Sequence, residues 1–215
     1  MQYATIFPQQ IGAAATFNRE LVKTMGAITA KDTRVIGSTW TFSPILDLAT
    51  EPRWARVYET FGEDPYLVAE LGAAIIRGYQ GDPINLRDNT KVAACMKHFI
   101  GYGEPRTGQD RNPSWIPDRQ LYQYFVPPFQ AAIDAGVATA MESYNDVNGE
   151  PVCASEKYLK KLIREEMGFQ GMLVTDWAEI KDLFRFHKVA PTEKDAVRIT
   201  MQRTTIDMSM VPSDV

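Results

Sequence analysis

One aspartate in the sequence, Asp176, ends a short apolar run and is followed directly by a tryptophan. The run Gly171–Thr175 opens at a glycine and has the length of one buried strand. A carboxylate in such a position suits an anionic nucleophile, and the indole of Trp177 offers a flat apolar face for a ring to stack against. The pair therefore favours chemistry on a polyhydroxylated ring such as a sugar.

Other apolar runs also end in chemically useful side chains. Val92–Phe99 carries Lys97 and His98, Ala138–Tyr144 ends on a tyrosine, and Thr39–Pro44 leads to Asp47. In a (β/α) barrel the carboxyl ends of the strands converge on one face and form the site. We therefore expect Asp176 to be ringed by cationic and aromatic side chains, namely Arg56, Lys97, His98, Arg111, Tyr144 and Trp177.

Structural roles for some of these residues remain open at this stage. Adjacent residues in a strand face opposite sides, so Lys97 and His98 share a site only if the strand bends or ends there. His98 could instead be a hydrogen-bonded core histidine, and Tyr144 could serve in packing. His187 and Glu193 are expected to be solvated helix positions.

The spacing of apolar residues predicts alternating strands and helices, which is typical of a parallel sheet with crossover helices. The expected strands are Ala4–Phe7, Val35–Phe42, Val92–Phe99, Ala138–Tyr144, Gly171–Asp176 and Thr205–Met210. The expected helices cover residues 17–31 (capped by Asn18), 63–80, 118–135 (interrupted at Pro127-Pro128), 155–167 (closed by Gly168), 179–186 and 192–202. This amounts to about six of the eight strands of a (β/α)8 TIM-type barrel, an α/β fold that is here only partial.

The composition excludes several classes of protein. The 215 residues are 45% apolar and 23% charged, as in ordinary globular domains, and the net charge of −4 argues against a nucleic-acid partner. No run is long enough for a membrane helix, and the first residues begin no signal peptide, so as written the chain is expected to be cytoplasmic. Cys95 and Cys153 form no metal pattern; Cys95 is expected in the core, with a Cys95–Cys153 disulfide as the alternative. We expect no metal and no cofactor.

Several sequence blocks resemble one known family in their order along the chain. The blocks are Phe42-Ser43-Pro44-Ile45-Leu46-Asp47, Pro52-Arg53-Trp54-Ala55-Arg56, Phe61-Gly62-Glu63-Asp64-Pro65, Lys97-His98-Phe99, Tyr144-Asn145-Asp146-Val147-Asn148-Gly149 and Thr175-Asp176-Trp177. In this order they resemble the N-terminal barrel domain of glycoside hydrolase family 3, in its β-glucosidase-like branch. The resemblance extends from Ile6 to Pro212, nearly the whole chain.

The resemblance implies a retaining, exo-acting β-glycosidase with Asp176 as nucleophile. It also implies that Arg56, Lys97, His98, Arg111 and Tyr144 hold the hydroxyls of the terminal sugar, while Trp177 lines the pocket. The implied substrate is a β-glucoside or a short β-glucan oligosaccharide. The loop after Phe99 lacks the histidine of the family's N-acetylglucosaminidase branch, and Ala55 stands where the family usually has glycine.

The resemblance also implies that the chain, a single barrel-type domain over residues 1–215, is a fragment. The family's first strand would precede Met1, and the second α/β domain that usually supplies the general acid/base would follow Val215. Glu104, Glu142 and Glu179 are candidates to replace this general acid/base, but each is more simply a structural or surface carboxylate. Two alternatives to an enzyme remain: a non-catalytic carbohydrate-binding fragment or subunit completed in trans by a partner chain, and a truncated product that covers its open edges by forming a homo-oligomer.

Overall fold

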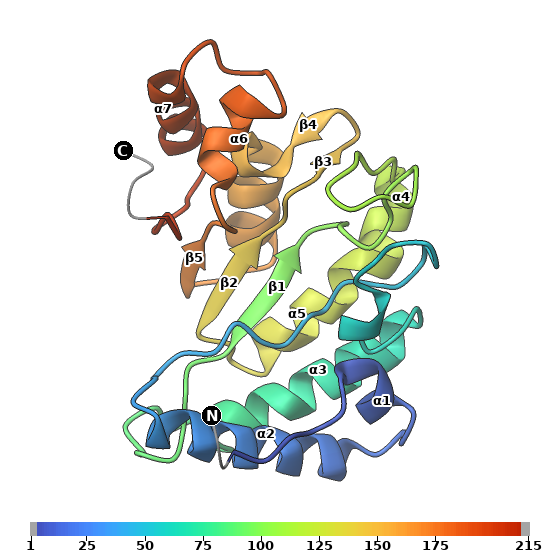
Figure 1. The fold of residues 1–215 in the computed structure, drawn as a ribbon, viewed down its shortest axis with the longest axis vertical. Helices are drawn as coiled ribbons and strands as arrows, with labels where there is room; N and C mark the ends of the chain where they lie inside the picture. The colour runs from blue at the N-terminus through green and yellow to red at the C-terminus, as the bar shows by residue number, and fades with distance from the viewer. Residues whose placement is uncertain (1–3, 212–215) are drawn as a thin grey trace.

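The computed structural model describes residues 4–211 and has a small parallel sheet at its centre, with helices packed around it (Figure 1). The sheet contains β1 (Cys95–Phe99), β2 (Thr139–Glu142) and β5 (Met172–Val174), in the spatial order β1-β2-β5. Ala140 pairs with Met96 on one side and with Leu173 on the other. All three strands run in parallel, so their carboxyl ends lie at one edge.

Helices connect the strands and cover the sheet. Their bounds are α1 (Gln10–Ala14), α2 (Arg19–Val35), η1 (Val57–Glu59), α3 (Pro65–Gln80), α4 (Asp118–Gln120), η2 (Leu121–Phe125), α5 (Val126–Asp134), η3 (Val152–Ala154), η4 (Lys157–Glu166), α6 (Glu179–Arg185) and α7 (Glu193–Arg203). A short hairpin of β3 (Asp146–Val147) and β4 (Glu150–Pro151) follows β2. None of the helices in residues 4–211 has the length and apolar character required to cross a membrane.

Helix starts follow the caps in the sequence. The side chain of Asn18 accepts a hydrogen bond from the amide of Leu21 at the start of α2, as predicted, and Asp64 does the same for Leu67 at the start of α3. Pro65 occupies the first turn of α3, where its missing N–H costs nothing. Gly168, with φ of +73°, follows η4 in the left-handed conformation that ends helices, so that prediction is also confirmed.

The two faces of the sheet bury different side chains because successive residues of a strand point to opposite sides. Met96, Ala140 and Leu173 belong to the main core, where Phe129 of α5 packs edge-to-face on Phe99. The opposite face buries a smaller cluster of Cys95, Met141 and Val174, with Trp40 and Met210 packed against it. Cys95 is thus a core residue, and no disulfide joins it to Cys153, which is also buried.

Three of the six expected strands, those around β1, β2 and β5, form the parallel sheet. The prediction of a strand was wrong for the other three segments, Ala4–Phe7, Val35–Phe42 and Thr205–Met210. Ala4–Phe7 is not a strand, and the segment predicted as Val35–Phe42 begins inside α2, which continues to Val35. Extended chain runs beside both edges of the sheet, but it pairs through single bridges, Ile45 with Lys97 and Val174 with Met208. The result is an α/β structure with a parallel sheet in which only part of the predicted barrel ladder is formed.

The helix expected to break at Pro127-Pro128 is continuous there. The wide turn of η2 leads directly into α5, and the two prolines fall in the first turn of α5. Proline has no N–H to donate to the preceding turn, and the wide turn of η2 lies at the residues whose carbonyls would have accepted those bonds. The prediction of an interruption was therefore wrong.

Candidate active site

Asp176 lies two residues beyond β5, at the edge where the strands end, and only 8% of its surface is exposed. Its main-chain amide donates to Oε1 of Glu142, at the end of β2, over 3.0 Å. Its own Oδ1 accepts the amide of Trp177 at 2.7 Å. The main chain and the carboxylate of Asp176 are therefore each held by a short hydrogen bond.

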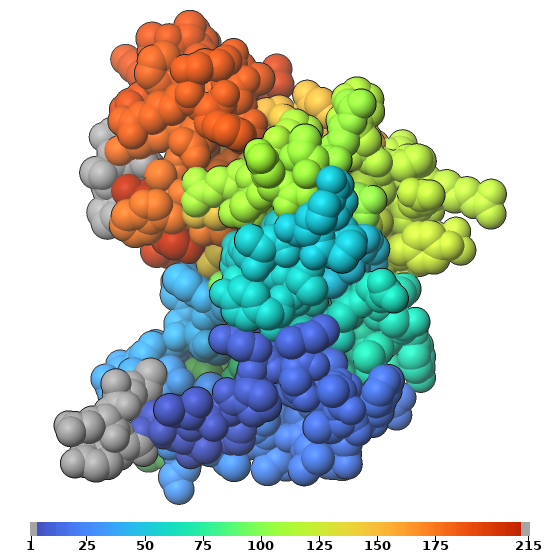
Figure 2. Space-filling view, turned by 45° about the vertical axis from the view of Figure 1, so that its right-hand side comes forward, coloured from blue at the N-terminus to red at the C-terminus, as the bar shows by residue number. Residues whose placement is uncertain are grey.

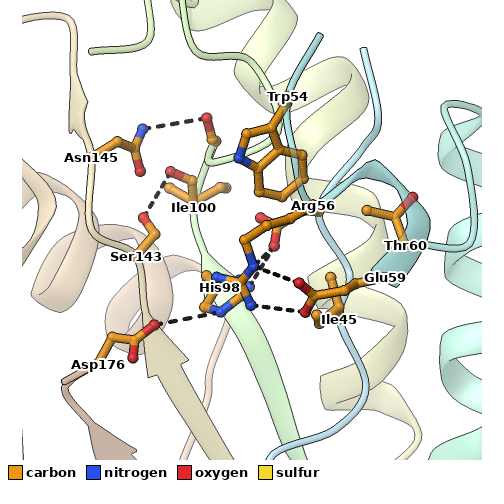
Figure 3. Close-up of polar contacts among 12 residues, drawn as sticks. Ile45, Trp54, Arg56, Glu59, Thr60, His98, Ile100, Ser143, Asn145 and Asp176 are labelled. Atoms are coloured by element: carbon orange, nitrogen blue, oxygen red, sulfur yellow. Dashed lines mark hydrogen bonds and ion pairs between the residues drawn. The ribbon is translucent and has the colours of Figure 1, made fainter. Parts of the chain in front are cut away.

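His98 faces Asp176 from the end of β1. The Nε2 atom of His98 is 3.5 Å from Oδ2 of Asp176, and its Nδ1 atom is 2.7 Å from Oδ2 of Asp47. Figure 3 shows the imidazole of His98 with Asp176 on one side and Arg56 with Glu59 on the other. The β1–β2 register shifts between Met96 and Phe99, so the strand departs from regular alternation at Lys97 and His98.

The pair of Asp47 and His98 is almost completely buried, which disfavours charge on both groups. Burial raises the pKa of Asp47 to about 7, against the hydrogen bond from the His98 amide. Burial, followed by the nearby Arg56 charge, lowers the pKa of His98 well below its ordinary value. A neutral His98 that donates Nδ1–H to Asp47 presents Nε2 as an acceptor, which suits a hydroxyl donor.

Arg56 precedes the short helix η1 and is held by Glu59 at its end. Nε and Nη2 of Arg56 contact the two carboxylate oxygens of Glu59 at 2.8 and 2.9 Å, and both side chains are about one-fifth exposed. Burial opposes the charge of Arg56, but the bidentate contact with Glu59 outweighs it and raises the pKa of Arg56. The guanidinium is thus a fixed cation beside His98.

An aromatic cluster of Trp54, Tyr102 and Tyr144 lies beside His98. The ring of Tyr102 packs edge-to-face against both Trp54 and His98, with 5.1 Å between centroids in each case. Burial, then the nearby charge of Asp176, raises the pKa of Tyr144, which is 6% exposed. Tyr144 is therefore both packed and directed at the site.

Arg111 closes this side of the site. Its guanidinium carbon lies 3.8 Å from the centroid of the Tyr144 ring, a cation–π contact, and its Nη1 is 3.8 Å from Oδ2 of Asp182 in α6. The neighbouring Asp110 accepts a hydrogen bond from Trp54 Nε1 at 2.8 Å. The loop after β1 thus contacts both the Arg56 loop and α6, and Figure 2 shows the three segments side by side.

Two of the predicted site residues stand apart from this inner group. Lys97 is partly buried and lines, with Glu59 and Ser43, a hollow of about 270 Å³. Burial, then the Arg56 charge, lowers the pKa of Lys97. Trp177 remains 58% exposed at the rim. A larger hollow of about 1090 Å³ lies along α1 and α3 and contains none of the predicted site residues.

Sequence reasoning missed several supporting residues. Glu59 follows Arg56 at the three-residue spacing typical of helical ion pairs, a signal that was available. Nothing local marks Tyr102 as the centre of the aromatic cluster. The prediction of a solvated His187 was wrong, because its side chain is 2% exposed and its Nε2 is 3.1 Å from Glu179 Oε1. Glu193 is a surface residue paired with Arg185, in line with the prediction.

Residues 4–211 contain no group of three or more His, Cys, Asp or Glu side chains placed to hold a metal ion. The side chains of this site therefore supply a fixed carboxylate surrounded by hydrogen-bonding groups. Asp176 offers the nucleophile, while His98, Arg56, Tyr144 and Arg111 offer directed polar groups and an aromatic wall.

Comparison with known proteins finds relatives that are similar in sequence and in structure. The chain is 45% identical over 216 residues to a lysosomal beta glucosidase of Dictyostelium discoideum, covering 99% of the chain and 26% of that protein. It is 38% identical to a beta-xylosidase of Formosa agariphila, covering 96% of the chain and 29% of that protein. The crystal structure of a beta-glucosidase from Listeria innocua in complex with isofagomine superposes with a TM-score of 0.92 at 38% identity, over 96% of this chain and 29% of that one.

The fold and site together define an α/β domain with a parallel sheet and a carboxylate at the ends of its strands. The model of the glycosyl hydrolase family 3 N terminal domain matches residues 1–215, and the chain belongs to this family. It spans between a quarter and a third of the length of these relatives, at 26% and 29% of the two curated proteins.

Proposed function

We propose that this chain is the nucleophile-bearing domain of a retaining, exo-acting β-glycosidase that hydrolyses terminal β-linked glucose-like residues. The observation that carries the proposal is the position of Asp176, fixed at the end of β5 and faced by His98 Nε2 at 3.5 Å. The names of its relatives, beta-glucosidases and beta-xylosidases, support the same substrate class.

In the first step an Asp176 carboxylate oxygen attacks the anomeric carbon. The bond from that carbon to the leaving oxygen breaks, and the leaving oxygen takes a proton from a general acid. Water then attacks the anomeric carbon of the glycosyl–Asp176 ester and gives its proton to the same group acting as base. The bond from that carbon to the Asp176 oxygen breaks, which frees the sugar and the carboxylate. The configuration at the anomeric carbon is retained because it is inverted twice.

We assign sugar binding to the polar groups that surround Asp176. His98 Nε2 accepts from a hydroxyl, and the fixed guanidinium of Arg56 donates to hydroxyl oxygens. Lys97, Arg111 and Tyr144 complete the set, and the exposed indole of Trp177 gives an apolar face to the ring. The proposed substrate is a β-glucoside or a short β-glucan oligosaccharide.

The general acid/base is proposed to come from outside this domain, from another part of the protein or from a complementing chain. Of the three glutamates weighed from the sequence as substitutes for the general acid, Glu142 and Glu179 are fully buried, whereas Glu104 is partly exposed in the loop after β1. A buried carboxyl has no path to the leaving oxygen of a bound glycoside. We therefore expect the chain alone to act on activated aryl glycosides, whose leaving groups need little protonation.

The test is mass spectrometry of the intact protein after incubation with a 2-deoxy-2-fluoro-β-glucoside that carries a dinitrophenyl leaving group. The expected result is a gain of one fluorosugar that disappears in Asp176→Ala and persists in Asp118→Ala, a matched exposed aspartate paired with Lys157. A folded wild-type chain that gains no mass contradicts the proposal. Sugar binding without labelling would instead identify a non-catalytic carbohydrate-binding fragment.

A further inference from the structure

Glu142 is the last residue of β2 and is 0% exposed. Its Oε1 accepts the main-chain amide of Asp176, while its Oε2 is buried and has no hydrogen-bond partner among residues 4–211. Such an atom is costly, because a buried polar group without a partner loses its hydration and gains nothing in return. The structure therefore calls for a reason why a glutamate is kept here.

The contact with Glu142 controls the geometry of the nucleophile. Oδ1 of Asp176 accepts a hydrogen bond from the amide of the next residue, Trp177. The orientation of the Asp176 carboxylate therefore depends on the position of the main chain. The residue after Trp177, Ala178, has a φ of +61°, so the chain turns sharply before α6 begins. Holding the Asp176 amide therefore also holds the direction of its carboxylate toward His98.

The charges around Glu142 are negative. The groups that act on it are the carboxylates of Glu179 in α6 and Asp176, and burial together with Glu179 raises the pKa of Glu142 well above its ordinary value. Glu179 itself faces His187, Asp182 and Asp176, and His187 faces Asp146 of β3. The cation of this group, His187, contacts Glu179 at 3.1 Å.

An ionised Glu142 would place a third negative charge beside those of Asp176 and Glu179. Two carboxyl groups that share a site do not both ionise readily, and the one without a cationic partner keeps its proton. His187 serves Glu179, so the proton stays on Glu142. In this form Glu142 still accepts the Asp176 amide through one oxygen, and it adds no repulsion to the attacking carboxylate.

We propose that Glu142 is a positioning residue for Asp176 that acts as a neutral carboxylic acid, with Glu179 and His187 carrying the charges of the buried group. The proposal rests on the proposed function only for the role of Asp176. It predicts that glutamine, the neutral isostere, replaces Glu142 without loss, whereas alanine does not.

The charge state is tested by infrared spectroscopy of the whole chain, with glutamate labelled by ¹³C at its side-chain carboxyl so that Asp47 does not contribute. At pH 8, above the pKa of about 7 that burial gives Glu179, we expect a C=O stretching band of a protonated glutamate that disappears in Glu142→Gln and remains in Glu104→Gln, a partly exposed loop residue. A spectrum in which Glu142→Gln leaves the band unchanged overturns the proposal. This readout needs no catalysis, so it stands even if the fluoroglucoside fails to label the protein.

The positioning role is tested by the rate of labelling by the fluoroglucoside. Glu142→Gln should label within about twofold of wild type, and Glu142→Ala should label slower by on the order of 10²-fold, since small displacements of a reacting group cost rates of this size. Circular dichroism shows whether the alanine variant is folded; if it is not, the glutamine variant decides. A folded Glu142→Gln that labels as slowly as Asp176→Ala contradicts the proposal, because it would mean that the ionised form is required.

Discussion

Oδ2 of Asp47 accepts both the Nδ1–H of His98, at 2.7 Å, and the main-chain amide of the same residue, at 3.1 Å. One carboxyl oxygen therefore fixes the ring and the backbone of His98 at once. Both side chains are almost fully buried, so no solvent competes for these bonds. Asp47 thereby holds the end of β1 next to Asp176.

Substitution of Asp47 should reveal this double contact. Asp47→Ala leaves two buried donors without an acceptor, and we expect the free energy of unfolding to fall by roughly 3 kcal/mol. Asp47→Asn keeps an oxygen in the same place and should cost about 1 kcal/mol. Urea denaturation followed by circular dichroism measures both. An asparagine variant as unstable as the alanine variant would show that the negative charge, and not the acceptor, is what His98 needs.

Arg56 and Arg53 offer a matched pair of experiments, because each is held by a carboxylate in bidentate geometry. Arg56–Glu59 is about one-fifth exposed on both sides, whereas the Arg53 side chain of the Arg53–Glu51 pair is 66% exposed. Glu59→Gln leaves the largely buried guanidinium without its counter-charge, and we expect a loss of about 2 kcal/mol and weaker sugar binding. Glu51→Gln should leave the urea midpoint and the binding unchanged. Equal effects of the two substitutions would argue against a special role for burial of Arg56.

The loop that carries Tyr102 and Arg111 depends on a close approach at Gly103. A Cβ at this position would lie 1.9 Å from the carbonyl oxygen of Leu48, which is backbone and has little freedom to move. We expect Gly103→Ala to cost at least about 3 kcal/mol and to reduce labelling, because the loop must shift. In Gly168→Ala the added Cβ meets nothing within 4 Å, so the only penalty is that of alanine in the left-handed conformation. We expect this substitution to lower the free energy of unfolding by about 1 kcal/mol. Similar losses in both would show that the approach to Leu48 relaxes easily.

The sequence was sufficient to predict the longer helices and the strands that are buried on both faces, but not the short helices α1, η1 and η3. Periodic apolar residues and caps such as Asn18 and Asp64 are local signals, and they place α2 and α3 within a few residues. The segment around Trp40 misled the prediction, because apolar residues there cover the sheet by packing on Cys95 and Met141 while forming a single bridge. An apolar run shows burial, but whether it forms a ladder depends on a neighbouring strand elsewhere in the chain.

The residues that face the site could be predicted from the sequence, but the contacts that hold them in place could not. Asp176 and His98 were placed because they end apolar runs at the same edge of a parallel sheet. The partners Asp47 and Glu142 lie 51 and 34 positions away in sequence from the residues they hold. Long-range contacts of this kind follow from the register of the strands, and no local pattern encodes them.

The buried position of His187 gives stability a dependence on pH. Burial disfavours its charge, but the contacts with Asp146 and Glu179 outweigh burial and raise its pKa from 6.5 to about 9. The folded state therefore binds a proton that the unfolded state has lost between these values, so this stability is fully present below pH 6.5 and disappears as the pH rises through 9. The shift corresponds to on the order of 3 kcal/mol.

Glu179 changes stability in the same direction but in a lower range, since burial raises its pKa from 4.5 to about 7. Between pH 7 and 9 the other histidine, His98, is neutral because its pKa is lowered, but Glu142 has a raised pKa and also acts there. The contribution of His187 is therefore the difference between wild type and His187→Gln. We expect wild-type unfolding midpoints in urea to fall more steeply over this interval than those of His187→Gln. Parallel curves for the two proteins would show that His187 is neutral in the folded state and would contradict the charge distribution assigned to Glu142, Glu179 and His187.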